Sequence, residues 1–377
     1  MEIIKVLASP LKIPVNFEEL GVDHRSVNHI THVEIETDTG ICGYGLTSIT
    51  QSRPVAEAIN SVLGPAIIGM DPTLSESIWN KLYWTATPWA QSGYASHAIS
   101  AIDLAIWDIK GKTQNLPIWR LLGGAHTSVP IYATCGFSFM SNSEIVEVVG
   151  RVVDKGFTGV KLQVGRPGLD YKGLPPDLNS LIKSDINRIQ KIRENIGPDI
   201  EIAVDAACRL DYVSALKLCQ GLEEFDISFF EEPIAQNDVG LLAKLRQKTN
   251  IPLTAGQNEG LAYRFRDLLV SQAVDIVQPN IIITGGLSQC LKIAGMASAF
   301  NVQISNGGGA PLHNVHFQAG VSNGTAVEYQ YNAVAACDVL YGEKPVHKNG
   351  CMILPEKPGF GLTPNRDVIR DTTDKAV

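Results

Sequence analysis

Residues 201–257 read EIAVDAACRLDYVSALKLCQGLEEFDISFFEEPIAQNDVGLLAKLRQKTNIPLTAGQ and contain three short apolar runs separated by two helix-like stretches. Each run ends at a side chain that carries an oxygen, at Asp205, Glu231 and Gln257, and both intervals are 26 residues. Such an interval accommodates one strand, one helix and their loops. The carboxyl ends of successive strands in a (β/α) barrel lie at one rim. We therefore expect the three side chains to converge as ligands of a hard divalent cation do.

The same order of strand, loop and helix continues on both sides of this stretch, from about residue 126 to residue 344. The apolar runs that we interpret as strands are VPIYATC (129–135), GVKLQVG (159–165), IEIAVDA (200–206), ISFFEEP (227–233), PLTAGQ (252–257), DIVQPN (275–280), VQISNG (302–307) and TAVEYQ (325–330). Eight parallel strands at this spacing predict a closed barrel rather than an open sheet. No glycine-rich phosphate loop follows any of these runs, so a nucleotide site is not expected.

Residues 1–125 have a different pattern. They open with the strand-like runs IIKVLASPLKI (3–13) and THVEIETDTGICGYG (31–45), and the second contains a turn at Asp38-Thr39-Gly40. Helix-like segments follow at about 54–68, 74–85 and 94–114. This alternation predicts a separate α+β domain in front of the barrel.

Composition excludes several classes of partner. The chain has 377 residues, a formal charge of −8 and no block of Lys or Arg, which argues against nucleic acid and anionic membranes as partners. Its hydrophobic share of 45 % is enough for sizeable cores, yet no run approaches the length of a membrane span. Seven scattered cysteines without a CxxC pair fit reduced thiols. We expect a cytoplasmic protein that binds a small molecule and forms a homo-oligomer.

Several motifs together resemble one family. They are IDLAIWDIKGK (102–112), PIWRLLGG (117–124), EEP (231–233) and the Gly pair at 285–286 that follows the sixth barrel strand. With the strand pattern, they are similar to the enolase superfamily, mandelate racemase and muconate lactonizing enzyme branch. The resemblance implies a modified TIM barrel of (β/α)7β type (126–344), an α+β N-terminal capping domain (1–125), and a C-terminal segment (345–377) that returns to the cap.

The resemblance also implies a Mg²⁺ site. Asp205 and Glu231 match the first two metal ligands of the family, and Gln257 stands where the family usually has a third carboxylate. A glutamine can offer a carbonyl oxygen, but one negative charge is lost, so a hard dication is held more weakly or not at all.

The acid and base positions depart further from the family. Lys161 matches the first lysine of a Lys-x-Lys pair on the second strand, and Gln163 replaces the second, which is usually the base. Asn280 and Asn306 replace an Asp–His dyad on the sixth and seventh strands. Glu328 matches an acid that contacts the substrate carboxylate. A nearby cation and burial are expected to lower the pKa of Lys161 and make it the base; the alternative is an electrostatic anchor.

Four further residues are candidates for contacting the substrate. His24 and Trp89 lie in the cap segments that confer specificity in the family. Arg209, just past the first metal ligand, either clamps a second carboxylate or lies at the surface. His313 either reaches the rim from the start of the helix after the seventh strand or is an ordinary helix residue.

These residues allow one favoured function and several alternatives. The family abstracts a proton next to a carboxylate with the help of Mg²⁺, and we favour acid-sugar dehydration by a lyase of this kind. Racemisation or epimerisation, and cycloisomerisation, are the alternatives within the superfamily. Because amides replace usual catalytic residues at Gln163, Gln257, Asn280 and Asn306, a catalytically disabled member that binds a ligand is a further alternative.

Overall fold

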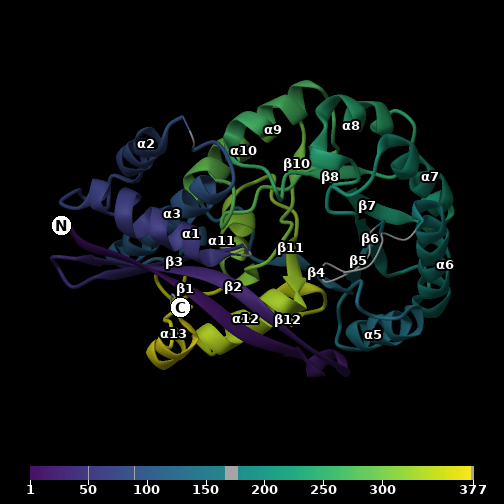
Figure 1. The fold of residues 1–377 in the computed structure, drawn as a ribbon, viewed down its shortest axis with the longest axis horizontal. Helices are drawn as coiled ribbons and strands as arrows, with labels where there is room; N and C mark the ends of the chain where they lie inside the picture. The colour runs from purple at the N-terminus through teal and green to yellow at the C-terminus, as the bar shows by residue number, and fades with distance from the viewer. Residues whose placement is uncertain (50, 89, 166–176, 375–377) are drawn as a thin grey trace.

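The computed structural model describes residues 1–49, 51–88, 90–165 and 177–374 and shows a small α+β domain beside a barrel (Figure 1). The first domain is built on an antiparallel sheet in the order β1-β2-β3. Its elements are β1 Ile3–Phe17, β2 Val22–Thr37, β3 Cys42–Ser48, α1 Ser52–Ala58, α2 Ser75–Ala86, α3 Tyr94–Gln114 and α4 Ile118–Leu121, with the short turns η1 Glu18–Leu20, η2 Ile59–Leu63 and η3 Pro65–Ile67.

Two features of this sheet follow from glycines. Gly40 has a φ of 81°, which lets the turn between β2 and β3 close where the sequence predicts it. Gly43 and Gly45 lie against α3, and a Cβ at either position would stand about 2 Å from a backbone oxygen of that helix. The helix therefore packs directly on the strand.

The single helix expected at 54–68 is instead α1 followed by the two shorter turns η2 and η3.

The second domain is a barrel of parallel strands. Within the described residues its strands are β4 Val129–Gly136, β5 Gly159–Gln163, β6 Glu201–Asp205, β7 Ile227–Glu231, β8 Leu253–Ala255, β9 Ile276–Val277, β10 Gln303–Ile304 and β11 Val327–Gln330. Consecutive strands pair from β4 to β10, and β11 pairs with β4. A bridge between Ile304 and Gly324 completes the ring. The eight apolar runs thus form the modified (β/α)7β barrel that the sequence predicts.

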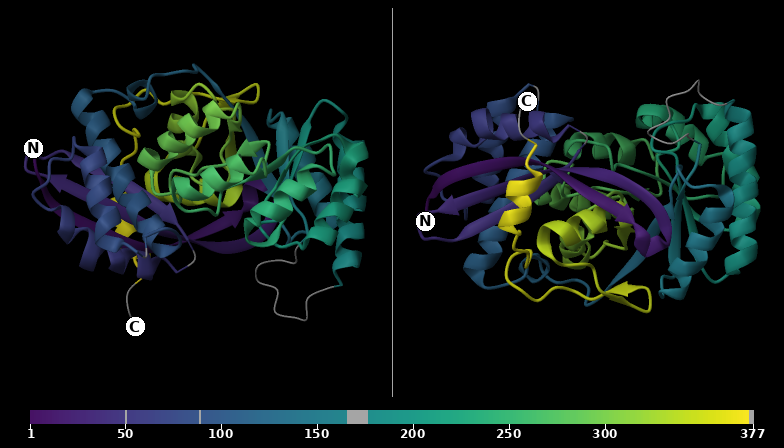
Figure 2. Two further views of the ribbon diagram at one scale, coloured as in Figure 1. Left: turned by 90° about the horizontal axis from the view of Figure 1, so that it is seen from above. Right: turned by 60° about the horizontal axis from the view of Figure 1, so that its bottom comes forward.

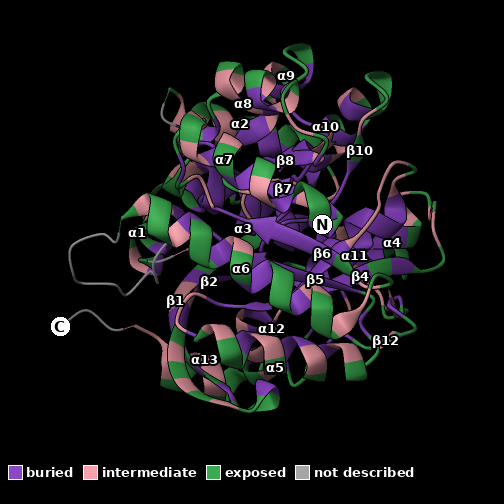
Figure 3. Cartoon of the chain, turned by 90° about the vertical axis from the view of Figure 1, so that its right-hand side faces the viewer, coloured by how far each residue is buried: buried purple, intermediate pink, exposed green. Residues whose placement is uncertain are grey.

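Helices connect successive strands and surround the barrel. Their bounds are α5 Asn142–Asp154, α6 Leu178–Ile196, α7 Tyr212–Leu222, α8 Val239–Arg246, α9 Leu261–Val270, α10 Leu287–Ala299 and α11 Pro311–Gly320, with η4 Glu223–Phe225 and η5 Ala235–Asn237 beside α7 and α8. The strands are buried, whereas the outward faces of helices such as α6 and α7 are exposed (Figure 3). This is the arrangement that amphipathic helices around an apolar sheet produce. No helix of the described residues is long and apolar enough to cross a membrane.

The last part of the chain runs back to the first domain (Figure 2). It comprises α12 Tyr331–Tyr341, β12 His347–Lys348, β13 Cys351–Met352 and α13 Arg366–Thr372. β13 pairs antiparallel with β4, and the backbone N–H of Asp374 donates to the carbonyl of Pro10 on β1. The buried carboxylate of Asp108 on α3 accepts hydrogen bonds from the backbone N–H groups of Tyr44 and Phe360. The final segment is therefore fastened to the cap at several points.

The ribbon formed by β1 and β2 reaches from the cap to the barrel. It passes beneath the barrel in Figure 1 toward α5. Arg151 on α5 donates to the carbonyl of Leu20 at the ribbon tip at 2.6 Å, and Lys155 donates to the carbonyl of Glu19 at 2.8 Å. These contacts hold the tip of the cap ribbon at the side of the barrel.

Candidate active site

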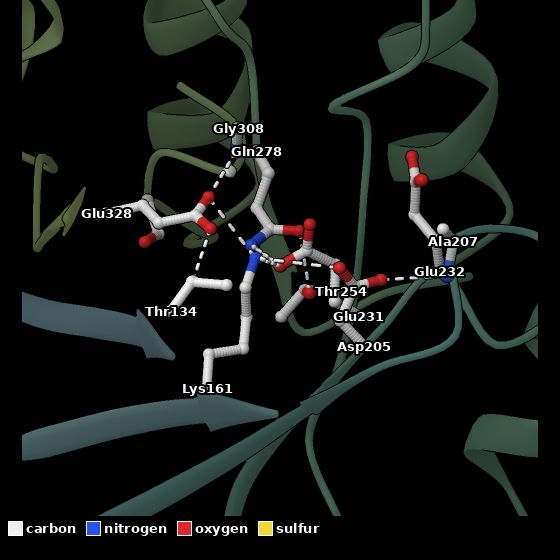
Figure 4. A network of polar contacts seen from close by, with 12 residues as sticks. Thr134, Lys161, Asp205, Ala207, Glu231, Glu232, Thr254, Gln278, Gly308 and Glu328 are labelled. Atoms are coloured by element: carbon white, nitrogen blue, oxygen red, sulfur yellow. Dashed lines mark hydrogen bonds and ion pairs between the residues drawn. The ribbon is translucent and has the colours of Figure 1, made fainter. Parts of the chain in front are cut away.

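Strand register brings the candidate metal ligands to one rim. Asp205 ends β6 and Glu231 ends β7, and the two residues are paired in the sheet; Gln163, which ends β5, is paired with Asp205. Gln257 follows β8 by two residues. Figure 4 shows the side chains of Asp205 and Glu231 converging near the end of Lys161.

Lys161 is the only lysine in this cluster among the described residues, and its side chain is 1 % exposed. Its Nζ lies 2.5 Å from Glu231, 3.2 Å from Glu328 and 3.9 Å from Asp205. Burial by itself lowers the pKa of the ammonium, but the facing carboxylates outweigh it and raise the pKa of Lys161 well above its ordinary value. The facing carboxylates therefore overturn the expectation that the pKa of Lys161 is lowered.

Glu231 is fully buried and has one satisfied and one unsatisfied oxygen. Its Oε2 accepts hydrogen bonds from Lys161 and, at 3.0 Å, from the Nε2 amide of Gln278. Its Oε1 has no hydrogen-bond partner among the described residues. Burial raises the pKa of Glu231 to about 8, and the charge of Asp205 adds to this effect, although Lys161 opposes it. A buried carboxylate oxygen without a partner is costly unless a cation or a donor reaches it.

The space beside that oxygen fits a small cation. A Cβ placed on Gly307 would lie 2.9 Å from Glu231 Oε1 and 3.0 Å from Gln257 Oε1, so both oxygens border the space that the glycine leaves open. Asp205 accepts a hydrogen bond from the backbone N–H of Ala207 at 2.7 Å. Two carboxylates and an amide oxygen are suitable ligands for Mg²⁺. No group of three or more His, Cys, Asp or Glu side chains is arranged for a metal within the described part of the chain, as the glutamine at position 257 implies.

Glu328 on β11 forms the other side of the cluster. One carboxylate oxygen accepts a hydrogen bond from the hydroxyl of Thr134, and the other accepts one from the backbone N–H of Gly308. With the ion pair to Lys161, these contacts fix the carboxylate at the barrel centre. It is 1 % exposed, so its charge acts in a medium of low polarity.

The two asparagines at the dyad positions are engaged with the backbone. Both Asn280 and Asn306 donate to the carbonyl of Gly307, each at 2.9 Å. The Oδ1 of Asn280 also accepts from the backbone N–H of Ile282 and from the side chain of Asn314, each at 3.1 Å. Amides neither lose nor gain a proton at neutral pH, so these residues shape the loop after β10 but do not transfer protons.

A cavity of about 300 Å³ lies at the mouth of the barrel, between the cap ribbon and the loops after β4 and β11. Gln163 lines it, and its Oε1 accepts from the backbone N–H of Ser138 at 3.0 Å. His24 on β2 lines the same cavity, and its ring is stacked on Phe139 with 3.7 Å between centroids. The structure therefore brings a cap residue and a barrel residue together around one space of a size suited to a small ligand.

Both parts of the chain match protein families. Residues 4–123 match the mandelate racemase and muconate lactonizing enzyme N-terminal domain, and residues 144–368 match the enolase C-terminal domain-like family. The chain belongs to the enolase superfamily. Its place is in the mandelate racemase and muconate lactonizing enzyme branch, as the motifs of the sequence indicate.

Relatives in this superfamily cover nearly the whole chain. An arabinonate dehydratase from Saccharolobus solfataricus is 31 % identical over 341 residues, which are 89 % of this chain and 88 % of the relative. The solved 3,6-anhydro-D-galactonate cycloisomerase from Zobellia galactanivorans has a TM-score of 0.86 and 31 % identity, with all of both chains covered. The L-talarate dehydratase from Polaromonas sp. JS666, solved with Mg and L-glucarate, has a TM-score of 0.86, 28 % identity and coverage of 99 % and 97 %.

Two of the expected contact residues, Arg209 and His313, lie away from the cluster. Arg209 is exposed, as its surface alternative implies. His313 is buried in α11, with its ring centroid 5.1 Å from that of Phe360 and 6.0 Å from that of Tyr341. Burial lowers the pKa of His313 to about 3, so this imidazole is a neutral packing residue between the barrel and the final segment. Trp89 lies outside the described residues.

Two acidic residues near the metal positions are held in other contacts. Glu232 accepts hydrogen bonds from the side chain of Asn237 and from the backbone N–H of Asn258. Glu259 pairs with Arg264 at 2.8 Å and does not turn toward Asp205. Neither side chain replaces the missing carboxylate at position 257.

The sequence interpretation missed residues that orient the charged groups in this enolase-superfamily site. Gln278 donates to Glu231, Thr134 donates to Glu328, and Gly308 donates through its backbone. Strand parity could have indicated Gln278, which precedes Asn280 by two positions. Thr134 carries a weaker signal, since a threonine in a buried strand is common.

Proposed function

We propose that this protein catalyses Mg²⁺-assisted abstraction of a proton next to the carboxylate of a small substrate, and that its reaction is the dehydration of an acid sugar. The observation that carries the proposal is the unpartnered Oε1 of Glu231, which faces the same small space as the amide oxygen of Gln257. Asp205, Glu231 and Gln257 would hold the ion there. When bound, it would supply the positive charge that a doubly charged enediolate requires.

Charge balance supports a dication at this place. When all three carboxylates of Asp205, Glu231 and Glu328 are ionised, they exceed the charge of Lys161 by two negative charges in a buried cluster. Uncompensated buried charge costs several kcal/mol or more, and Mg²⁺ would neutralise it. Relative to the family pattern, Gln257 removes one negative charge and Gln163 removes one positive charge. The two departures therefore leave the total charge of the site unchanged.

Lys161 and Glu328 would bind and orient the substrate. The ammonium group of Lys161, held between Glu231 and Glu328, places a fixed positive charge beside the carboxylate that the substrate would present. Glu328 is oriented by Thr134 and Gly308 to accept a hydrogen bond from a substrate hydroxyl or a protonated carboxylate. Fixed charges of this kind act without reorganisation in a site that excludes water.

The opposite face of the site favours elimination over racemisation. Racemisation requires competent acid and base groups on two faces of the substrate carbon, whereas Asn280 and Asn306 both donate to the carbonyl of Gly307 and cannot transfer protons. A dehydration needs proton transfer on one face only, provided that the same group takes the proton and returns it.

A second candidate function rests on the same amides. Hydrogen bonds hold all three amides in place, those of Gln163, Asn280 and Asn306. Since none of them has to transfer a proton to be held there, the arrangement also suits a member that only binds an acid sugar. Such a protein would keep the ion and the carboxylate contacts but would lack a base.

A screen of acid sugars separates the two functions. The protein is incubated with Mg²⁺ and a panel of aldonates and aldarates that includes arabinonate and L-glucarate, and 2-keto-3-deoxy products are detected with semicarbazide. Dehydration predicts a product that disappears with EDTA and returns with Mg²⁺. The variant Asp205→Asn, which lacks a candidate metal ligand, should lose the Mg²⁺-dependent formation of product. A raised melting temperature with one acid sugar but no product from any would favour the binding function.

A further inference from the structure

The cavity beside Gln163 is lined by His24, a side chain to which the proposed reaction assigns no role. Of the described residues that line it, His24 and Arg25 are the titratable ones, and the others are aromatic, hydroxyl or amide side chains. Arginine stays protonated in proteins, which leaves the imidazole as the side chain of this lining whose ring nitrogens can both accept and donate a proton.

The position of His24 is fixed from both the cap and the barrel. Its ring lies parallel to that of Phe139, with 11° between the planes, and Phe17 packs at 5.5 Å. The ribbon tip that carries it is anchored to α5 through Arg151 and Lys155. A ring stacked on its face keeps both nitrogens at its edge, and neither has a hydrogen-bond partner among the described residues. The imidazole is therefore held in place while its nitrogens remain available.

Two other polar groups near the cavity, on Gln163 and Lys161, already have partners. The amide of Gln163 accepts from Ser138, and the ammonium of Lys161 is surrounded by three carboxylates. Gln163 ends the strand that carries Lys161, two residues further toward the cap, which is about 7 Å along a strand. A substrate whose carboxylate meets Lys161 would extend past Gln163 toward His24.

We infer that His24 is the proton-transfer residue of this enzyme, contributed by the cap in place of the lysine that Gln163 replaces. This inference rests on the proposed dehydration. A nitrogen of the neutral imidazole takes the α-proton, and the electron pair of the C–H bond moves into the carboxylate to give the enediolate. The imidazolium then returns that proton to the departing β-hydroxyl, so the C–O bond breaks and water leaves. The resulting enol tautomerises to the 2-keto-3-deoxy acid, and the imidazole is neutral again.

The test compares variants of the Mg²⁺-loaded full chain with the acid sugar that gives a product in the screen. His24→Gln removes the titratable ring, and His24→Phe removes it but keeps an aromatic face on Phe139. Asp23→Asn, an exposed neighbour on the same strand, is the matched control. Loss of a general acid–base group lowers the rate by about 10²–10⁴-fold. We expect that loss in kcat for both His24 variants, together with disappearance of the acidic limb of the pH profile of kcat/KM.

The possible results separate this inference from the proposed function. If Asp23→Asn matches the wild type while both His24 variants lose kcat and keep their melting temperature with Mg²⁺, His24 is the proton-transfer residue. If His24→Phe retains kcat and the acidic limb, the ring serves only packing, and the inference is overturned although dehydration stands. If the wild-type protein neither forms a product nor exchanges the α-proton of any acid sugar in D₂O, the proposed function fails, and the role of His24 fails with it.

Discussion

Replacing Gln257 with glutamate would restore a carboxylate to the place where the candidate metal site has an amide. The side chain borders the space beside Gly307, which it shares with the unpartnered oxygen of Glu231. Without a cation the new charge adds to a buried cluster in which three carboxylates already face the single ammonium of Lys161. With Mg²⁺ bound, the same charge lies at contact distance from the ion.

The size of the effect follows from Coulomb's law. One added negative charge at about 4 Å from a dication contributes roughly 2–8 kcal/mol at effective dielectric constants of 80 to 20, twice the value for two unit charges. The lower end corresponds to Mg²⁺ binding about 30-fold tighter in Gln257→Glu than in the wild type. In the absence of Mg²⁺ the sign reverses, because the extra carboxylate repels Glu231, and we expect the variant to melt at a lower temperature than the wild type.

Titration calorimetry with Mg²⁺ and thermal melting with and without it measure both effects. Gln163→Glu is the matched control, since it makes the same chemical change at the end of β5, beside the cavity and outside the ligand set. The reasoning is refuted if Gln257→Glu binds Mg²⁺ no tighter than the wild type, or if Gln163→Glu gains as much affinity.

Three further predictions concern charges at other positions. Since burial raises the pKa of Glu231 to about 8 without a cation, Mg²⁺ must displace a proton at neutral pH, and its affinity should rise about tenfold from pH 6 to 7 and level off above pH 8; calorimetry giving a flat profile would contradict this. Lys161→Met should lower the free energy of unfolding in Mg²⁺-free urea titrations by about 3–5 kcal/mol, because it leaves buried carboxylates unpaired. Asp108→Ala, which removes the acceptor for Tyr44 and Phe360, should make the C-terminal segment sensitive to limited proteolysis, whereas unchanged cleavage would show that other contacts hold it.

The barrel and the meeting of the strand-end oxygens could be predicted because they depend on local pattern and spacing. A short apolar run such as IEIAVDA forms a buried strand, and equal intervals place Asp205, Glu231 and Gln257 on neighbouring strands at the same rim. Both inferences need only strand polarity and the order of the elements. They do not depend on which side chains later surround a given group.

The pKa of Lys161 could not be predicted in the same way. The direction of the pKa shift of Lys161 is decided by how close its Nζ lies to three carboxylates. These belong to Asp205, Glu231 and Glu328, which are far from Lys161 in the sequence. Burial and facing charge act in opposite directions, so only the assembled geometry shows that the carboxylates outweigh burial.

The placement of His313 also depended on distant segments. The spacing of His313 and His316 indicates one helix face but not what covers it, and the covering rings of Tyr341 and Phe360 come from α12 and the final segment. A signal was nevertheless present. The helix PLHNVHFQAG has no charged residue, which is typical of a helix buried on all sides, and all of its residues are buried.

The most direct test of the account is α-proton exchange followed by ¹H NMR in D₂O. The wild-type protein is incubated with arabinonate or L-glucarate in Mg²⁺, in EDTA, and in EDTA followed by excess Mg²⁺. The account predicts that the signal of the proton next to the carboxylate disappears with one of these acid sugars in Mg²⁺, persists in EDTA and disappears again when Mg²⁺ is restored. Exchange that proceeds equally in EDTA, or a signal that persists under all three conditions, would contradict metal-assisted proton abstraction by this site.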